Sequence, residues 1–402
     1  MANDIKQAVI LAGGRGERLK PMTDHLPKPM VEFHEKPFLE YLIRQLKCQG
    51  IEEIVLLVGY LGKIIENYFG NGKSLGVNIR YSYSPVESQT GQRLTNAKHL
   101  LDSEFMLLYC DNYCPINLKE LADQWISHKS ETIITIYNNT DMFTKNNVMV
   151  NQQGYVEIYD PTRKHPDLNG VEIGYCITNH RTIDRLPQTN IRFEHYIYPL
   201  LASEGSLRAH QTNHRYYSIG SKDRLKSTES FLKPQKAVIL DRDGVLNKKP
   251  PQAEYVRSWE EFEWIPGSLE ALKLLKQSGY KIIVVTNQPG IARGIMEESD
   301  LSKIHNKMVE DATKFGATID QIYYCPHGWN EGCFCRKPRP GMLFNAQKDH
   351  HLDLSKTLFI GDDDRDKQAS ISGGCQFRFV NDKVKLIDIA RSYVSSAGET
   401  IK

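Results

Sequence analysis

The sequence lacks any apolar run near the roughly 20 residues that a membrane-spanning helix needs. Its opening residues, Met-Ala-Asn-Asp-Ile-Lys, also lack the apolar core of a signal peptide. No charge of one sign dominates, since Lys and Arg total 51 and Asp and Glu total 49. We therefore expect neither a membrane nor a nucleic-acid partner, because both usually require a basic surface.

A disulfide framework is missing as well. Of the eight cysteines, three lie between residues 325 and 335 and the others are scattered. This usage favours a reducing, cytoplasmic location. With 402 residues, 40% of them hydrophobic and 25% charged, the chain is expected to form two or three globular domains, and nothing in it indicates an oligomeric state.

Two carboxylates follow directly on a short apolar stretch, Ala237–Leu240, which predicts a buried strand. Side chains alternate along a strand, so Asp241 and Asp243 can point to the same side where the strand ends. A divalent cation would keep both ionised and leave one free to attack phosphorus. The alternative is a helix cap or turn, where Asp and Gly are common.

Further strands in the second half also end in polar side chains, at Thr286 and at Asp362. Strands alternate there with amphipathic segments such as Ser268–Ser278, which predicts an α/β fold with a doubly wound parallel sheet. Ligands gather at the carboxyl ends of such strands. We therefore expect these two residues to converge with Asp241 and Asp243.

A cysteine- and histidine-rich loop follows. Two compact pairs, Cys-x-His and Cys-x-Cys, provide the ligands of a closed tetrahedral zinc site, namely Cys325, His327, Cys333 and Cys335. With no open coordination position, the predicted Zn²⁺ is structural. The alternative is that the cysteines are free thiols in a hydrophobic loop.

Other polar residues of this half have simpler expectations. Arg293 lies on a glycine-flanked loop after Thr286, where it could contact substrate or cap a helix. His305, His350 and His351 lie in polar stretches and are expected to face solvent.

The first half begins with an apolar strand, Gln7–Ala12, that runs into a glycine-rich turn. Glycines let backbone N–H groups approach an anion, and Arg18 adds a positive charge. Lys28 lies between two prolines, on a stiff segment suited to aiming a cation at phosphate. Taken alone, both segments could equally be surface turns.

The domain boundary is expected near Pro234. Residues Lys222–Gln235 predict a short helix that ends before this proline, and a new strand begins at Lys236. We place the first domain at residues 1–233 and the second at residues 234–402.

The first domain resembles the sugar-nucleotidyltransferase family, in the order strand, Ala-Gly-Gly-x-Gly-x-Arg-Leu, Pro-Lys-Pro, over most of residues 5–230. The resemblance implies a Rossmann-like domain in which a sugar 1-phosphate attacks the α-phosphorus of an NTP. It implies that Arg18 and Lys28 neutralise the phosphates and that Asp111 holds Mg²⁺. Gly13 and Gly14 would bind the nucleotide, and Glu172 a sugar hydroxyl.

The first domain also departs from this family. Ser218 stands where the family has its second metal-binding Asp, and Ser84–Leu94 lacks one glycine of the base-contacting loop. The lysine that holds the sugar phosphate is absent near Asp160, where Arg163 or Lys164 could replace it. These differences leave open a catalytically inactive, nucleotide-sensing domain.

The second half resembles the haloacid dehalogenase superfamily, and within it the heptose 1,7-bisphosphate 7-phosphatases and their histidinol-phosphatase relatives. The matching motifs are Asp-x-Asp-Gly-Val-Leu-Asn, Val-Thr-Asn-Gln-x-Gly-Ile-Ala-Arg-Gly, Cys-Arg-Lys-Pro and Gly-Asp. The resemblance implies that Asp241 is the nucleophile of an aspartyl-phosphate mechanism and Asp243 the general acid and base. Thr286 and Lys337 would stabilise the phosphoryl group.

The same resemblance implies further ligands. Mg²⁺ would be held by Asp241, by Asp243 through its backbone, and by Asp362. Arg336 would recognise the substrate, and we also expect Asn287 and, from its loop position, Arg293 to contact it. Asp363 stands where the heptose phosphatases commonly have a lysine.

Together the two resemblances predict a bifunctional enzyme of nucleotide-sugar synthesis for a surface polysaccharide. A phosphate would be removed from position 7 of heptose 1,7-bisphosphate, and the remaining 1-phosphate would be activated with an NTP, GTP being expected. The alternative is a phosphatase for another small phosphate, joined to a cytidylyl- or other nucleotidyltransferase for a different polyol or sugar.

Overall fold

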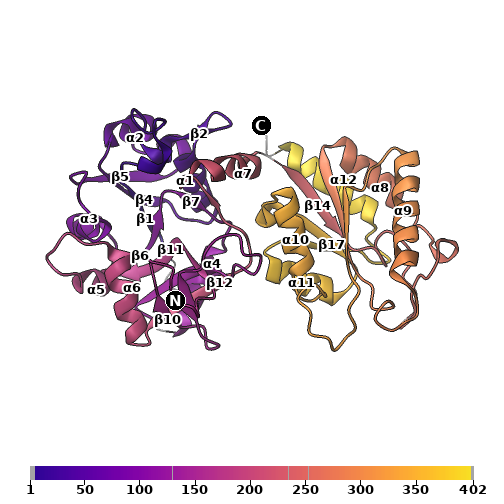
Figure 1. Cartoon of the computed structure of the whole chain (residues 1–402). Helices are drawn as coiled ribbons and strands as arrows, with labels where there is room; N and C mark the ends of the chain where they lie inside the picture. Colours follow the sequence, from indigo (N-terminus) through magenta and orange to yellow (C-terminus); the bar gives the residue numbers. More distant parts are fainter. Residues whose placement is uncertain (1–4, 129, 234, 252, 400–402) are drawn as a thin grey trace. The chain divides into compact units, whose positions relative to one another are not determined.

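A computed structural model describes residues 5–128, 130–233, 235–251 and 253–399. Backbone contacts divide the chain into two units, Met1–Lys233 and Pro234–Lys402. Each unit has its own β-sheet covered by helices (Figure 1). Within the described ranges, no helix is both long enough and apolar enough to cross a membrane.

The described part of the first unit contains a seven-stranded sheet in the order β12-β8-β11-β6-β1-β4-β5. Its strands are β1 (Gln7–Ala12), β4 (Glu53–Val58), β5 (Asn78–Tyr83), β6 (Glu104–Tyr109), β8 (Thr132–Tyr137), β11 (Val171–Asn179) and β12 (Leu207–Thr212). β11 runs antiparallel to both of its neighbours, whereas the other pairs are parallel. From β1 the chain adds β4 and β5 on one side and then crosses to β6 on the other, so a crevice for ligands is expected beyond the carboxyl ends of β1 and β6.

Helices cover both faces of this sheet, which explains why β1 is buried throughout and apolar after Gln7. The helices are α1 (Phe38–Cys48), α2 (Gly62–Phe69), α3 (Thr90–Ala97), α4 (Leu118–His128), α5 (His180–Asp184), α6 (Phe193–Ser203) and α7 (Lys222–Leu232). Ala8 and Ile10 share a core with α1 and α4. Val9 and Leu11 share the opposite core with α3 and α6.

The described part of the first unit also contains three short strand pairs outside the main sheet. They are β2 (Glu32–Phe33) with β3 (Lys36–Pro37), β7 (Asn112–Tyr113) with β13 (Tyr217–Ser218), and β9 (Val148–Val150) with β10 (Val156–Tyr159). The β7–β13 pair brings Ser218 next to Asn112, directly after Asp111 in the chain.

The described part of the second unit contains a five-stranded, wholly parallel sheet in the order β16-β15-β14-β17-β18. The strands are β14 (Lys236–Leu240), β15 (Tyr280–Asn287), β16 (Gln321–Cys325), β17 (Leu358–Gly361) and β18 (Gln376–Phe379). Their order reverses between β14 and β17. This places the ends of these two strands, at Asp241 and Asp362, at the point where such sheets bind ligands.

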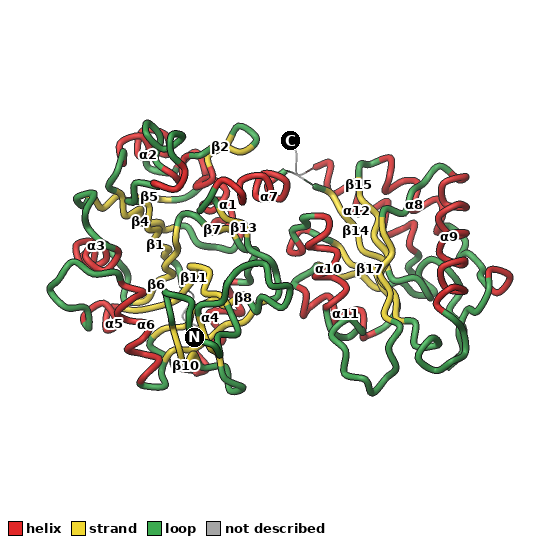
Figure 2. Tube along the Cα trace, viewed as in Figure 1, coloured by secondary structure: helices red, strands yellow, loops and turns green. Residues whose placement is uncertain are grey.

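The helices of the second unit form two layers around its sheet (Figure 2). They are α8 (Ser268–Gln277), α9 (Glu298–Phe315), α10 (Gly341–His350), α11 (Asp364–Gly373) and α12 (Leu386–Glu399). Val238 and Leu240 of β14 share a core with α8, α9 and α12. Ala237 and Ile239 share the opposite core with α10 and α11.

The predicted α/β architecture with two domains is confirmed, as is the parallel doubly wound sheet of the second. The sheet of the first domain differs from a simple Rossmann-like arrangement in its antiparallel strand β11. That strand carries Glu172, so the antiparallel insertion supplies one wall of the site described below.

Two candidate active sites

The first unit has a cavity of about 710 Å³ at the carboxyl edge of its sheet. All six residues predicted for this domain line it, namely Gly13, Gly14, Arg18, Lys28, Asp111 and Glu172. They come from the loops after β1 and β6 and from β11. Sequence segments more than a hundred residues apart therefore meet at the expected crevice.

Lys28 and Asp111 form an ion pair in this cavity, with Nζ 2.5 Å from Oδ2. Burial opposes charge on the lysine, but Asp111 outweighs it and raises the pKa of Lys28. Burial likewise opposes ionisation of Asp111, but Lys28 holds its pKa below the ordinary value. Both groups are therefore charged, as phosphate binding and metal binding require.

Arg93 is a structural residue that the sequence did not reveal. Its guanidinium is buried, with an exposed fraction of 4%, and donates hydrogen bonds to several carbonyl groups. The acceptors are the carbonyl oxygens of Gly13, Val58, Pro85, Val86 and Ser88. A β-carbon at position 13 would lie 2.3 Å from Nη1 of Arg93, so this close approach requires Gly13.

Ser218 lies beside Asp111, as the main chain of Ile219 donates a hydrogen bond to the Asp111 carbonyl (2.9 Å). Its hydroxyl accepts a hydrogen bond from the main chain of Gly220 (2.9 Å) and supplies no negative charge. Arg163, one of the two possible replacements for the missing lysine, lines the cavity.

Glu172 is partly buried in the wall of the same cavity, and its Oε1 accepts a hydrogen bond from the Gly174 main chain (2.6 Å). Burial raises the pKa of Glu172 to about 8, and the carboxylates of Glu194 and Asp111 contribute in the same direction. A protonated Glu172 can donate a hydrogen bond to a sugar oxygen as well as accept one.

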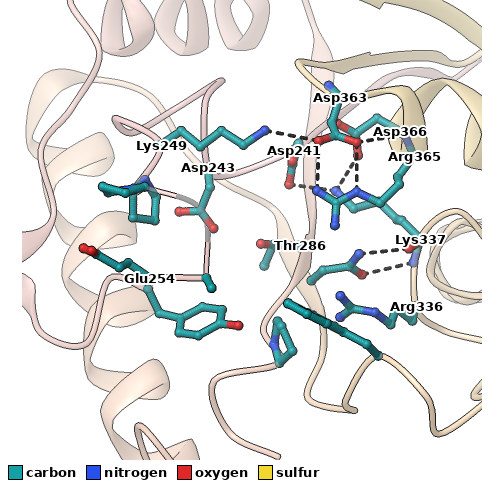
Figure 3. Close-up of a pocket in the computed structure, with 17 residues that line it drawn as sticks. Asp241, Asp243, Lys249, Glu254, Thr286, Arg336, Lys337, Asp363, Arg365 and Asp366 are labelled. Atoms are coloured by element: carbon teal, nitrogen blue, oxygen red, sulfur yellow. Dashed lines mark hydrogen bonds and ion pairs between the residues drawn. The ribbon is translucent and has the colours of Figure 1, made fainter. Parts of the chain in front are cut away.

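The second unit has a cavity of about 500 Å³ at the corresponding edge of its sheet (Figure 3). Six of the predicted residues line it, namely Asp241, Asp243, Thr286, Asn287, Arg336 and Lys337. Figure 3 shows Asp243, Thr286, Lys337 and Arg336 around this space, arriving from different strands and loops.

The ammonium group of Lys337 is almost completely buried and has three acceptors. Nζ lies 2.8 Å from Oδ1 of Asp241, 2.7 Å from Oδ1 of Asp366 and 3.0 Å from the Val285 carbonyl oxygen. Burial opposes its charge, but the two carboxylates outweigh burial and raise the pKa of Lys337. The amide of Asn287 fixes the same residue by bonding both its backbone N–H and its carbonyl, each at 3.0 Å.

Asp243 accepts hydrogen bonds from Arg242, Asn247 and Gln288. Burial alone would raise its pKa, but Arg242 and the amide donors lower it. Arg242 is fully buried, and its Nη1 lies 3.3 Å from Nε2 of His305. The expectation that His305 faces solvent is therefore wrong, since this side chain is 7% exposed and supports the arginine that orients Asp243.

Asp241, Asp362 and Asp366 each offer a carboxylate oxygen within 4.8 Å of the others. Oδ1 of Asp362 is buried and, within the described ranges, accepts no hydrogen bond. Burial, followed by the charge of Asp366, raises the pKa of Asp241. A divalent cation at this point would satisfy the open oxygen and favour the ionised acids, so the three residues fit a hard cation such as Mg²⁺.

Asp366 was missed in the sequence, although a signal exists. It is the third residue of α11 and forms a capping box with Asp363, so its carboxylate turns back and accepts hydrogen bonds from the main chain of Asp362 and Asp363. Gly244 is also constrained by the space around it, because a side chain at this position would meet Asp362. Its φ is +90°, and a β-carbon there would lie 2.1 Å from Oδ2 of Asp362.

Asp363 forms a charge cluster with two cations that were also missed. Its carboxylate pairs with Nε of Arg365 at 2.8 Å and with Nζ of Lys249 at 3.3 Å, and all three residues line the cavity. Figure 3 shows both cations directed toward this carboxylate. The hydrogen bond from Arg365 is the largest cause that lowers the pKa of Asp363. Lys249 also pairs with Oδ2 of Asp362 at 2.8 Å, so two cations lie at this wall although the expected lysine is absent.

Arg293 does not lie among the residues that line the cavity. Its guanidinium donates a hydrogen bond to the Tyr255 hydroxyl (2.9 Å) and packs against two rings that do line it, those of Tyr255 and Trp329. Arg293 therefore contacts two residues of the cavity wall, and it does not cap α9, whose N-cap is Glu297.

The four predicted zinc ligands lie together, with one ligand atom of each within 4.8 Å of the others. Sγ of Cys325 and Sγ of Cys335 are both 3.6 Å from Sγ of Cys333. Zn–S bonds of about 2.3 Å in a tetrahedron place sulfur atoms about 3.8 Å apart. The cluster therefore fits a tetrahedral ion of this kind.

Two family models match the chain, one in each unit. Residues 7–158 match the model described as nucleotidyl transferase. Residues 236–378 match the model described as polynucleotide kinase 3 phosphatase.

Among known proteins, the chain is similar to D-glycero-β-D-manno-heptose-1,7-bisphosphate 7-phosphatase of Bordetella bronchiseptica, with 41% identity over 140 residues. That match covers 35% of this chain and 77% of the relative. The chain is also similar to the D-glycero-α-D-manno-heptose enzyme of Campylobacter jejuni, with 40% identity over 159 residues, 39% of this chain and 90% of the relative.

A solved structure from Bacillus anthracis, described as a glucose-1-phosphate thymidylyltransferase in complex with a sucrose, is similar with a TM-score of 0.51. The match covers 56% of this chain and 94% of that chain at 17% identity. At this identity the likeness concerns the fold alone.

Glu172→Gln tests the raised pKa in the first cavity. Between the ordinary value of 4.5 and about 8, the folded protein holds a proton on Glu172 that the unfolded chain has released. The resulting stabilisation is complete below the ordinary value and is lost as pH rises through about 8. The variant should therefore match the wild type in Tm at about pH 5 and exceed it at about pH 9.

Differential scanning calorimetry measures both proteins across this range. The exposed Glu120→Gln on α4 serves as the control, and its Tm difference from the wild type should not change with pH. If the Tm difference between Glu172→Gln and the wild type were also independent of pH, this would contradict the raised pKa of Glu172.

Proposed function

The second domain belongs to the D-glycero-D-manno-heptose-1,7-bisphosphate 7-phosphatase family and the first is a nucleotidyl transferase domain, and from this premise we propose that the chain catalyses two steps of nucleotide-sugar synthesis. The second domain removes the 7-phosphate of D-glycero-D-manno-heptose 1,7-bisphosphate. The first transfers a nucleotidyl group, from GTP in our proposal, to the sugar 1-phosphate that remains.

The observation that carries the phosphatase is the buried contact of Lys337 with Asp241 inside a cavity that also contains Asp243 and Thr286. Lys337 and the Arg242 main chain both bind Oδ1 of Asp241, so Oδ2 is the oxygen that attacks phosphorus. The bond between phosphorus and the sugar oxygen breaks, and Asp243, which must carry a proton at this step, gives it to that oxygen and becomes the carboxylate.

The aspartyl-phosphate formed in this way is then hydrolysed. Asp243, whose pKa Arg242 lowers, takes a proton from water, and the water oxygen attacks phosphorus to release phosphate and restore Asp241. Thr286 and Lys337 donate hydrogen bonds to the equatorial oxygens of the transferring group.

Asp241, Asp362 and Asp366, with the backbone of Asp243, would hold Mg²⁺ in this domain. When bound, the ion neutralises charge on the phosphoryl oxygens and keeps the acids ionised. Cys325, His327, Cys333 and Cys335 would hold a structural Zn²⁺, which fixes the loop that leads directly into Arg336 and Lys337.

The nucleotidyl transfer is supported by the cavity that joins all six predicted residues of the first domain. Backbone N–H groups at Gly13 and Gly14 bind the triphosphate, and Arg18 and Lys28 neutralise charge at the α-phosphorus as pyrophosphate leaves. Asp111 would hold Mg²⁺, which when bound would supply positive charge to the phosphates, and Glu172 binds a sugar hydroxyl. The heptose assignment is supported by the names of the phosphatase relatives and by the fusion of both domains in one chain, whereas the choice of GTP is part of our proposal.

Asp241→Asn should lower phosphate release from heptose 1,7-bisphosphate by at least about a thousandfold, because the amide cannot form the phospho-enzyme. Release is measured in steady state with Mg²⁺. The exposed Asp382→Asn is the matched control and should retain wild-type turnover. Full activity of the Asp241 variant would mean that the nucleophile is assigned wrongly.

Asp111→Asn should lower pyrophosphate release from GTP and heptose 1-phosphate by about a hundredfold or more, because the neutral amide binds metal weakly. The exposed Asp123→Asn on α4 should behave as the wild type. If the wild type releases no pyrophosphate with any NTP and sugar 1-phosphate, the absence of a carboxylate at Ser218 favours a nucleotide-sensing domain instead.

Purified protein should contain one zinc ion per chain, and removal of the ion should lower phosphatase activity about tenfold or more, because Lys337 is positioned by the loop. Cys333→Ser should lose the metal, measured by atomic emission. Cys375→Ser changes a cysteine outside the cluster and should keep both metal and activity. Unchanged activity without zinc would exclude the positioning role.

A further inference from the structure

The mouth of the phosphatase cavity carries two aromatic rings that the reaction described above does not use. Trp329 and Tyr255 both line the cavity. The Trp329 side chain is 60% exposed, which is unusual because a large apolar ring is normally removed from water. An exposed indole at the edge of a binding cavity is positioned to contact a ligand.

Arg293 holds the two rings in place. Its guanidinium carbon lies 5.7 Å from the centre of the Tyr255 ring and 5.5 Å from the centre of the Trp329 ring. A hydrogen bond to the Tyr255 hydroxyl (2.9 Å) fixes its orientation. One cation therefore connects two loops that are far apart in the sequence.

The segment that carries Arg293 is itself attached to the cysteine- and histidine-rich loop. Ala292 N–H donates to the Pro326 carbonyl (3.2 Å), and Gln288 N–H donates to the Cys325 carbonyl (2.8 Å). Trp329 lies on that loop between His327 and Cys333, two members of the metal-binding cluster. The position of the Trp329 ring is therefore fixed both by Arg293 and by the loop that carries the ring.

We propose that Trp329 and Tyr255, braced by Arg293, form the subsite that binds the carbon chain of the sugar. This inference rests on the proposed sugar bisphosphate phosphatase. With the reacting phosphate at Asp241, the remaining carbons extend through the cavity toward its mouth. The C–H faces of a sugar pack well against an indole, while its hydroxyl groups remain in water. Trp329 and Tyr255 are specificity-determining residues, and Arg293 is a positioning residue.

The test compares a seven-carbon sugar bisphosphate with glycerol 3-phosphate, which is too short to reach the rings. Trp329→Ala should lower the ratio of the two kcat/KM values at least tenfold, through a higher KM for the sugar bisphosphate. Trp329→Phe should keep most of the ratio, because a ring remains. Arg293→Ala should act in the same direction as Trp329→Ala, and Arg293→Lys should restore part of the ratio.

Phe334→Ala is the matched control, since it removes an exposed ring from the same loop outside the cavity. Its substrate ratio should equal that of the wild type. An equal loss in this control would mean that order in the loop, rather than the rings, determines selectivity, and would overturn the proposal. An unchanged ratio of the two kcat/KM values in both Trp329→Ala and Arg293→Ala would also overturn the proposal.

Binding gives a second readout. In the Asp241→Asn background, the sugar bisphosphate should change tryptophan fluorescence, and adding Trp329→Phe should abolish the change. Persistence of the full signal would contradict the subsite. Failure of the proposed function can be distinguished from failure of the subsite. If the proposed function is wrong, the wild type itself will hydrolyse glycerol 3-phosphate and no sugar bisphosphate.

Discussion

The buried ammonium of Lys337 is the interaction on which the phosphatase site depends. It lies between the carboxylates of Asp241 and Asp366 and also bonds the carbonyl oxygen of Val285. Without this cation, two buried carboxylates would face each other across a dry space, which is energetically unfavourable. The contact thus connects the end of β14, the start of α11 and the end of β15 through a residue from a loop.

The position of that loop residue is fixed by its neighbours in the chain. The cysteine and histidine cluster ends two residues before Lys337, and the Asn287 amide binds both polar groups of the lysine backbone. A flexible lysine would lose side-chain entropy at such a site, and an already fixed backbone reduces that loss. The phosphatase centre is therefore assembled from four strand and loop segments, none of which forms it alone.

The sequence predicted those residues whose position follows from sheet geometry. Asp241 and Thr286 stand at the ends of apolar strands, and parallel strands bring their carboxyl ends to one edge. Arg93 and Arg242 could not be predicted in this way, because their partners are backbone carbonyls or side chains set by tertiary packing. The buried position of His305 could have been predicted in part. Its spacing from Leu301, Ile304 and Met308 follows the buried face of α9, and this helical pattern outweighs the polar neighbours that suggested solvent.

Gly244 shows how tightly the phosphatase centre is constrained. The positive φ of the backbone disfavours most other residues at this position, and separately the carboxylate of Asp362 would have to move to admit a β-carbon. The two restrictions are independent, so relief of one leaves the other in force. A shift of the Asp362 carboxylate would therefore make room for a methyl group without removing the backbone strain, and it would displace a candidate metal ligand.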